Sequence, residues 1–580
     1  MKKNRRMSKS NLNKPITSMN IAMKNIKLLS LSMFLVCMNI VLDHPLYAQD
    51  RNEEVTIIAP YKPTISDANK MNFQPSISDQ GNMMPAMEFS LRSKLYETNV
   101  NPKPIEATKK PTDPKKKLLR NLIRAGFGNY ITPYFEFFAN SRQSSKHAFG
   151  VHLRHISSHG DIKDYAPSDY SQSDVQVYGK KFIGDHTFSA NIFYDHDIVH
   201  YYGFMPDEYP EMNFPKDDIR HRFQTFGLDA GIGSNFTSGT PFNYHTEIRY
   251  YYIEDNYKAS EHNIFFGGLL DKEFQFSSIT ENQSLGLDLD FNYFINADSI
   301  SDYNGALLKL EPFISTDFNQ YKFYLGVNLT SRIETSTRLH VYPAIRVEIK
   351  LLKDALALFA GINGSLDRVT LRSLSLENPF INSTLPLEYT NHKFVFDAGI
   401  LGNISQNLNY QVSGSTSIID NMPFYVNDTM NGLGNMFTLV YDNVNVLNLH
   451  AGLGFHRSKV LNLWLGADYY QYKMDKEEKP WQKPGYRIKF GGDYIIQDKY
   501  IVKAELFVQG PMYAKLYESG EVLSQKMNGW ADLNLGFEYR ITNSFSAFVN
   551  INNVLNNGYF KWYNYPVQKI NVLAGVSFAF

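Results

Sequence analysis

The chain ends with Ile570-Asn571-Val572-Leu573-Ala574-Gly575-Val576-Ser577-Phe578-Ala579-Phe580, in which apolar side chains recur at every second position. One side of this alternation carries Val572, Ala574, Val576, Phe578 and Phe580. The other side carries Asn571, Gly575 and Ser577, interrupted by Leu573 and Ala579. A period of two is typical of a β-strand, and an apolar side opposite a small, polar side fits a strand between lipid and a water-filled interior. The stretch therefore predicts a membrane-spanning strand.

The composition supports many strands of this kind. The chain has 580 residues with 41 Phe and 38 Tyr but only 4 Trp, and its mean hydropathy is -0.34. Beyond the N-terminus, no stretch holds the roughly 18 apolar residues that a membrane helix needs. Abundant Tyr and Phe fit the aromatic girdles of a membrane barrel, whereas a sandwich array or a propeller is the soluble alternative. The 58 acidic and 58 basic residues balance, so charge gives no indication of a nucleic-acid partner.

Alternation recurs from Asn121 onward in about 22 segments, an even number within the range of bacterial barrels. One of these segments is expected at 501–514. In one segment Leu287, Leu289 and Phe291 alternate with Asp288 and Asp290. An ionised group facing lipid costs about 2–4 kcal/mol at mid-bilayer, so the charged side must face the lumen. By this rule we expect the lumen to contain Asp288, Asp290, Asp532, Glu538 and Arg540. We expect its carboxylates to pair with bases such as Arg540 and Lys503.

The spacing of the predicted strands alternates between short turns and longer connections. The longer connections are expected at 157–173, 199–220, 366–390, 419–436, 473–486 and 553–568. Outer-membrane barrels have short periplasmic turns and longer external loops. If Asn121 starts at the periplasmic face, all of the longer connections lie outside. The sequence thus predicts an all-β fold, a transmembrane antiparallel barrel over residues 119–580.

The first 48 residues have the features of an export signal. Basic residues precede an apolar run from Leu28 to Leu42, and Ala48 provides a small residue before a cleavage point at Gln49. The only cysteine, Cys37, lies within that run. The mature chain would therefore form no disulfide and no thiolate metal site. We expect residues 1–48 to be a signal peptide.

Residues 49–118 differ in composition from the predicted barrel. They are rich in Pro and Lys, especially at 101–104 and 109–117. Proline removes backbone donors and favours extended chain, so we expect a mostly disordered periplasmic arm. Its lysines are either a solvated linker or a contact to anionic lipid or to a periplasmic partner.

The C-terminal region carries motifs that resemble the barrel of TonB-dependent receptors, including the substrate-importing type abundant in Bacteroidota. The resemblance lies in Trp530-Ala531-Asp532-Leu533-Asn534-Leu535-Gly536, Asn552-Asn553-Val554-Leu555-Asn556 with Tyr559, and Val572–Phe578. It implies an outer-membrane protein inserted by the barrel-assembly machinery. The terminal aromatics Phe578 and Phe580 resemble the C-terminal assembly signal of bacterial outer-membrane barrels.

The arm contains a short β-branched segment at 53–59. Its residues Glu54, Val55, Thr56, Ile57, Ile58 and Ala59 look like the TonB box of the same family, a strand that adds to a sheet of the energy-transducing protein. An unpaired exposed strand is the alternative. The family's plug domain is well over a hundred residues long, whereas only about 60 Pro-rich residues separate Ala59 from the first predicted barrel strand. We therefore expect no globular plug.

Motifs for catalysis or cofactors are weak. His196 and His200 would be about 13 Å apart on a strand, too far to share one zinc ion. Gly231-Ile232-Gly233 lacks the third glycine and the helix of a dinucleotide site. We predict no enzyme, no catalytic or metal residue and no cofactor.

Aromatic residues in the predicted external loops are candidate ligand contacts. They are Tyr201, Tyr202, Phe204, Tyr209, Trp562 and Tyr563. They could form stacking faces for a sugar or a peptide, or they could simply pack the loops and the membrane interface.

The sequence therefore predicts an outer-membrane barrel with a periplasmic N-terminus that transports or receives a small ligand. The expected partners are outer-membrane lipid, the barrel-assembly machinery, and TonB or another periplasmic or lipoprotein partner that contacts the arm. The alternative is a non-transporting scaffold in an outer-membrane assembly or export complex.

Overall fold

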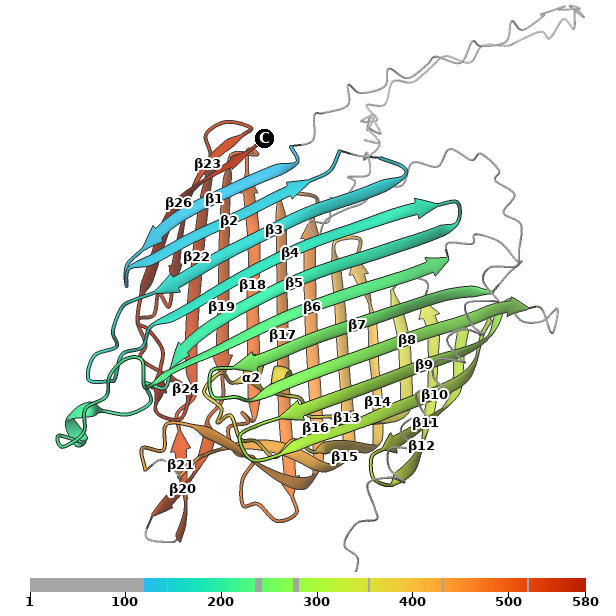
Figure 1. The fold of residues 1–580 in the computed structure, drawn as a ribbon. Coiled ribbons are helices and arrows are strands. Elements are labelled where there is room, and N and C mark those ends of the chain that lie inside the picture. The colour runs from blue at the N-terminus through green and yellow to red at the C-terminus, as the bar shows by residue number, and fades with distance from the viewer. Residues whose placement is uncertain are drawn as a thin grey trace, which may run out of the picture. The chain divides into compact units, whose positions relative to one another are not determined.

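The computed structural model describes residues 119–142, 144–234, 242–274, 281–352, 355–429, 432–518 and 521–580. These residues form one closed sheet of 22 antiparallel strands, a β-barrel (Figure 1). Among them, no helix is both long and apolar enough to cross a membrane. The predicted signal peptide at 1–48, the arm at 49–118 with its segment at 53–59, and the question of a plug lie outside the described residues.

Each barrel strand pairs with the strand that follows it in the sheet. The first strands are β1 (Asn121–Gly128), β2 (Thr132–Asn140), β3 (His147–Ser158), β4 (Tyr170–Ile183), β5 (His186–His200), β6 (Arg220–Ser234), β7 (Asn243–Asp255), β8 (Ser260–Phe274), β9 (Glu281–Ala297), β10 (Asp302–Phe318) and β11 (Tyr321–Ile333). The others are β12 (Thr337–Leu352), β13 (Leu356–Arg368), β14 (Tyr389–Ser405), β15 (Leu408–Asn427), β16 (Phe437–Arg457), β17 (Leu461–Met474), β18 (Tyr486–Ile496), β19 (Tyr500–Gln509), β22 (Trp530–Arg540), β23 (Phe545–Asn552) and β26 (Asn571–Ala579). The prediction of 22 barrel strands is confirmed.

Six smaller elements lie in the connections between barrel strands. They are the 3₁₀ turn η1 (Pro206–Glu208), the helix α2 (Leu371–Glu377), the hairpin β20 (Met512–Glu518) and β21 (Glu521–Met527), and the short pair β24 (Phe560–Trp562) and β25 (Tyr565–Pro566). The hairpin and the short pair form separate two-stranded sheets. None of them belongs to the barrel sheet.

Two predicted boundaries are wrong. The strand expected at 501–514 ends at Gln509, because Gly510 and Pro511 separate β19 from β20 and proline cannot donate to a ladder. The first half of the connection expected at 419–436 is strand, because β15 stays paired with β16 as far as Asn427 after an irregularity between Ile419 and Met422. The β15–β16 hairpin therefore extends beyond its neighbours.

The predicted alternation matches the exposure of the side chains. Val576 and Phe578 are 45% and 46% exposed, whereas Leu573 and Ser577 on the other side of β26 are buried. The same outward face carries Leu535, Phe537 and Tyr539 on β22. The opposite face of β22 carries Asp532 and Glu538, which are less exposed. Their position in the lumen stays a prediction.

Among the described residues, the longest connections lie at one end of the barrel, where short turns at 129–131, 256–259, 298–301 and 334–336 also lie. Short turns at 184–185, 319–320, 406–407, 458–460 and 497–499 lie at the end that holds Asn121 and Phe580. Long connections at 159–169, 201–219, 369–388, 475–485 and 553–570 lie at the other end, which we call the loop end. Figure 1 shows β20, β21 and β24 there, far from the C-terminus. Which end faces the periplasm stays a prediction.

The barrel closes where β26 pairs with β1, and Gly126 lies directly opposite Gly575 in that pair. The buried ring of Phe548 on β23 covers this point. A Cβ atom added to Gly575 would lie 2.3 Å from the Ala125 carbonyl oxygen and 2.5 Å from Phe548 Cζ. The closing strands therefore have no space for a side chain here.

We expect Gly575→Val to lower the free energy of unfolding by about 1–3 kcal/mol, because overpacking forces backbone and ring to shift. Urea unfolding, followed by the heat-dependent electrophoretic shift of the folded barrel, would measure the change. The matched control is Gly466→Val on β17, where an added Cβ meets no atom within 4 Å. Equal stability of the two variants would contradict a tightly packed closure.

Candidate functional site

Connections that are distant in sequence pack together at the loop end. Their apolar residues form a buried cluster, here called the loop core, with side chains from β6, β7, β15 and β16 as well. The loop core consists of Phe223, Ile253, Ala259, Val369, Leu371, Leu374, Ile381, Leu385, Tyr425, Phe437, Leu439, Trp562 and Tyr565. Burial of this much apolar surface holds the connections in one arrangement.

The helix α2 lies in the connection between β13 and β14. Thr370 caps its first turn, since its hydroxyl accepts the Ser373 amide at 3.0 Å while Ser373 Oγ accepts the Thr370 amide at 3.2 Å. Leu371 and Leu374 are buried in the loop core. This reciprocal cap starts a helix too short to be stable alone, and packing of its apolar side completes it.

Ionic contacts join α2 to opposite sides of the barrel. At one end the Arg372 guanidinium lies 4.0 Å from the Asp195 carboxylate on β5. At the other end Glu377 accepts hydrogen bonds from Lys483 at 2.7 Å and from the Tyr425 hydroxyl on β15 at 3.1 Å. Strands β5 and β15 are about half a circumference apart in the closed sheet. Through these side chains the seven-residue helix, visible inside the loop end in Figure 1, links two sides of the barrel mouth.

A buried carboxylate fixes the start of this helix. Glu261 on β8 is fully buried and accepts hydrogen bonds from the Leu371 amide at 2.8 Å, Asn296 Nδ2 at 2.7 Å and the Tyr251 hydroxyl at 2.6 Å. Three donors satisfy a charge that would otherwise be costly to bury. Loop and barrel wall are thus joined by a polar contact as well as by the loop core.

A second buried polar group joins the connection at 201–219 to the same assembly. The Tyr201 hydroxyl donates to the Ile381 carbonyl at 2.6 Å and lies 2.6 Å from His221 Nδ1. His221 Nε2 lies 3.0 Å from Asp255 Oδ2, which also accepts the Ser383 hydroxyl. Burial raises the pKa of Tyr201 well above its usual range, so its hydroxyl stays protonated.

The predicted ligand-contact aromatics are mostly inside the packed loops. Tyr202 packs on the Tyr565 ring, and Trp562, only 6% exposed, packs on Tyr425. Tyr201 and Phe204 belong to an adjoining buried cluster with Ala166 and Ile219, against which Tyr209 packs. Tyr563 lies apart from these residues. Ligand contact by this set stays a prediction, and these rings, Tyr563 apart, pack against other side chains of the loop end.

Tyr563 lines a cavity of about 900 Å³ at the loop end, here called the aromatic cavity. Its other walls include the rings of Trp530 and Tyr559, which are stacked at 4.2 Å and 14°. The Tyr559 hydroxyl donates to Asp532 Oδ2 at 2.6 Å. Trp530 Nε1 and Asp532 Oδ1 are buried without a partner among the described residues. An unpaired donor and acceptor beside a stacked aromatic face suit a ligand with both polar and flat surfaces.

The predicted lumen residues lie at separate places on the wall. Lys309 contacts Asp288 at 2.8 Å and Asp290 at 3.4 Å. Glu538 accepts the Ser546 hydroxyl at 2.7 Å and lies 3.9 Å from Arg124.

Arg540, one of the bases expected to pair with these carboxylates, does not contact them. Arg540 donates to the Asp498 carbonyl at 3.4 Å, beside a short turn. The expected pairing with Arg540 is therefore wrong, because strand register and not sequence spacing selects the partners.

The terminal aromatics share the outer face of the barrel. The Phe578 and Phe580 rings stack at 5.4 Å, and both are 46% exposed. Their role as an assembly signal stays a prediction. Over the described ranges there is no group of three or more His, Cys, Asp or Glu that could hold a metal ion.

Sequence reasoning missed several residues of the loop end. Trp530 and Tyr559 appeared only as family motifs, and their stacking depends on a connection that returns to the start of β22. Arg368 and Asn296 each end a strand and carry no local signal. Only the pairing of β8, β9 and β10 brings Asn296 close to the connection after β13.

These observations define the class of fold, a closed 22-stranded antiparallel β-barrel with its longest connections packed at one end. No protein-family model and no curated protein sequence matches this chain.

Solved structures do match. They include the pyoverdine outer membrane receptor FpvA from Pseudomonas aeruginosa PAO1, with 13% identity and a TM-score of 0.61 over 81% of this chain and 79% of that one. The ferric-catecholate import receptor Fiu from K12 E. coli has 10% identity and a TM-score of 0.60 over 80% and 82%. The siderophore receptor PirA from Acinetobacter baumannii has 10% identity and a TM-score of 0.61 over 80% and 81%.

Similarity at this level of identity concerns the fold. All three neighbours are described as receptors, and FpvA as an outer membrane receptor.

We expect Glu261→Ala to loosen the connection at 369–388, because it leaves buried donors unpaired at about 1–3 kcal/mol each. Hydrogen exchange in detergent, read by mass spectrometry, should become at least about tenfold faster in that segment. Glu478→Ala is the control, since Glu478 is exposed and its Lys479 contact is on the surface. Unchanged exchange at 369–388 would show that the carboxylate does not hold the loop.

Proposed function

We propose that the protein is an outer-membrane transport receptor, similar to TonB-dependent receptors, which admits a small ligand from the loop end. The observation that supports this is the helix α2, held between β5 on one side and β15 with Lys483 on the other. A passive pore does not need contacts across its mouth, whereas a receptor needs a closed resting state that ligand binding can shift. The cross-mouth contacts provide such a state.

The aromatic cavity is the proposed first contact for the ligand. Trp530, Tyr559 and Tyr563 line it, and the unpaired Trp530 Nε1 offers a donor. Asp532 is not part of the lining and acts through Tyr559, whose hydroxyl it accepts at 2.6 Å. Tyr201, Tyr202, Phe204, Tyr209 and Trp562 would then act indirectly, by holding the loops closed until the ligand binds.

The opposite end of the barrel is proposed to face the periplasm. There the arm at 49–118, or a partner bound to it, would occupy the lumen in place of a plug. The segment Glu54–Ala59 would pair with TonB by strand addition. This organisation corresponds to a plugless receptor of the Bacteroidota type, exported by the signal at 1–48.

The closed mouth is testable by conductance in planar bilayers. We compare the full chain with a variant in which residues 371–384 are replaced by a short Gly-Ser linker, each with and without residues 49–117. If both ends are closed, large conductance appears only when the linker and the deletion are combined. A barrel that lacks residues 49–117 and carries Arg372→Ala/Glu377→Ala should conduct only part of the time. The reason is that partly exposed ion pairs contribute only about 0.2–1 kcal/mol each.

The control is Arg346→Ala/Asp397→Ala, which removes an inward-facing pair of the wall at 3.4 Å, remote from α2. This variant should conduct no more than the same chain with Arg346 and Asp397 intact. If the combined linker and deletion variant is folded and does not conduct, the lumen is filled by the barrel itself and transport is excluded.

TonB coupling has its own test. We expect the full chain to retain the periplasmic domain of its own TonB in a pull-down, and deletion of Glu54–Ala59 to remove that retention. A matched deletion at 64–69 in the same arm should have no effect. Equal retention by both deletions would assign the contact to another part of the chain.

A scaffold function is the second candidate, supported by the hairpin β20–β21. Tyr517, Val522 and Leu523 are 45%, 48% and 42% exposed on it, and Figure 1 shows the hairpin beyond the barrel rim. A scaffold would co-purify with a fixed partner, and Val522→Ser/Leu523→Ser would release that partner.

A further inference from the structure

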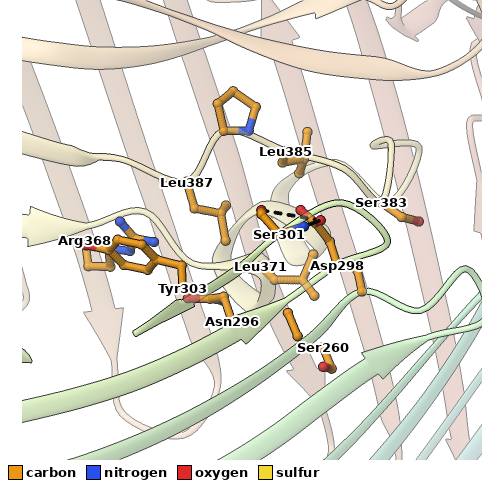
Figure 2. A pocket seen from close by; sticks show the side chains of 13 residues that line it. Ser260, Asn296, Asp298, Ser301, Tyr303, Arg368, Leu371, Ser383, Leu385 and Leu387 are labelled. Atoms are coloured by element: carbon orange, nitrogen blue, oxygen red, sulfur yellow. Dashed lines mark hydrogen bonds between the residues drawn. The ribbon is translucent and has the colours of Figure 1, made fainter. Parts of the chain in front are cut away.

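A small cavity lies between the connection 369–388 and the ends of β8, β9, β10 and β13. Its volume is about 180 Å³. It is lined by Ala259, Ser260, Asn296, Ala297, Asp298, Ser301, Tyr303, Arg368, Leu371, Ser383, Leu385, Pro386 and Leu387. Figure 2 shows Arg368 and Tyr303 on one side and Asp298 and Ser301 on the other, with Leu371 and Leu387 between them.

Arg368 brings a cation to this cavity. Its guanidinium lies over three rings, 4.4 Å from Tyr303, 4.9 Å from Phe294 and 5.0 Å from Tyr389. Among the described residues no carboxylate is within ion-pair distance of it, and its Nε has no hydrogen-bond partner. Aromatic faces favour a cation but supply no acceptor for its N–H groups.

The nearest carboxylates already have other partners. Glu334 binds Arg332 Nη2 at 2.6 Å and accepts the Tyr303 hydroxyl. Glu261 is saturated by Tyr251, Asn296 and the Leu371 amide. A largely buried guanidinium with unfilled donor capacity favours an anionic oxygen from a ligand.

Asn296 offers this cavity an acceptor that lacks a donor. It is 8% exposed, and its Nδ2 donates to Glu261 at 2.7 Å, which fixes the orientation of the amide. Its Oδ1 is buried without a partner among the described residues. Asp298 adds a carboxylate to the same cavity. Asp298 Oδ1 already accepts the Ile300 and Ser301 amides at 2.7 and 2.8 Å, which leaves its Oδ2 for a ligand. Asn296 Oδ1 and Asp298 Oδ2 can each accept a donor, which suits a ligand that carries N–H or O–H groups as well as an anionic end.

The remaining wall is apolar, formed by Leu371, Leu385 and Leu387. We propose that this cavity binds a small α-amino acid, with its carboxylate on Arg368, its ammonium on Asn296 Oδ1 and Asp298, and a short apolar side chain on the leucines. This inference rests on the proposed function, because it names the class of small ligand that the receptor would bind at its loop end.

The test measures binding directly in detergent, with the full chain and L-alanine as probe, by titration calorimetry. We expect saturable binding at one site per chain. Acetate and methylammonium, which carry only one of the two charges, should each bind at least about tenfold more weakly, because a hydrogen bond to a charged group contributes about 1.5–3 kcal/mol.

Arg368→Gln should weaken L-alanine binding at least about tenfold. The matched control is Arg346→Gln, since Arg346 also lies over a ring, Phe359 at 4.7 Å, but has a carboxylate partner and lies outside the cavity. If Arg368→Gln does not fold, as judged by its electrophoretic shift, Leu387→Trp replaces it, because it fills the cavity while keeping the guanidinium.

L-alanine binding that survives both Arg368→Gln and Leu387→Trp would overturn the proposal, as would binding of acetate as tight as that of L-alanine, or no saturable binding. The measurement needs no membrane and no TonB. A failure here therefore leaves the conductance result standing, and a barrel that never conducts can still bind the amino acid.

Discussion

The structure depends on the need of every backbone N–H and C=O group in lipid to find a partner within the protein. A sheet meets this need only if its two edges join. The join is made by β1 and β26, where the amides of Arg120 and Asn121 donate to the Phe580 carbonyl at 3.1 and 2.9 Å and the Phe580 amide donates back to Asn121 at 2.9 Å. The first and last strands of the barrel are thus fixed together, and every other strand takes its place between them.

Closure divides the side chains into three environments. Outside, lipid accepts apolar residues without packing them closely. Inside the wall, charges are matched across strands, as in Arg154 with Asp174 at 2.9 Å and His450 with Asp468 at 2.8 Å. At the loop end the strands extend into water, so the hydrophobic effect can again build a core.

The loop core gives the closed barrel a distinct mouth. The wall strands β5, β8 and β15 each contact α2 through a polar side chain, and apolar residues fill the space around it. This arrangement combines a rigid wall with a connection whose contacts can be exchanged for those of a ligand.

The sequence alone was sufficient to predict the barrel fold, because the alternation of apolar and polar residues can be read within each strand. Alternation along β26, β22 and β9 shows which side faces lipid, and the spacing of turns shows which ends meet. The ends of the strands were harder to predict. The strand expected at 501–514 ends at Gln509, and β15 continues into the expected loop because β16 remains paired with it.

The sequence by itself determined the barrel, its strand number and the inward side of each strand, because lipid imposes a period of two on every segment. Only the tertiary structure decided which residues meet. Asp290 faces Lys309 because of the β9–β10 register, Tyr201 reaches Ile381 across the loop core, and Arg368 lies beside a cavity that Asn296 shares. These contacts join residues that are far apart in sequence, and no local pattern specifies them.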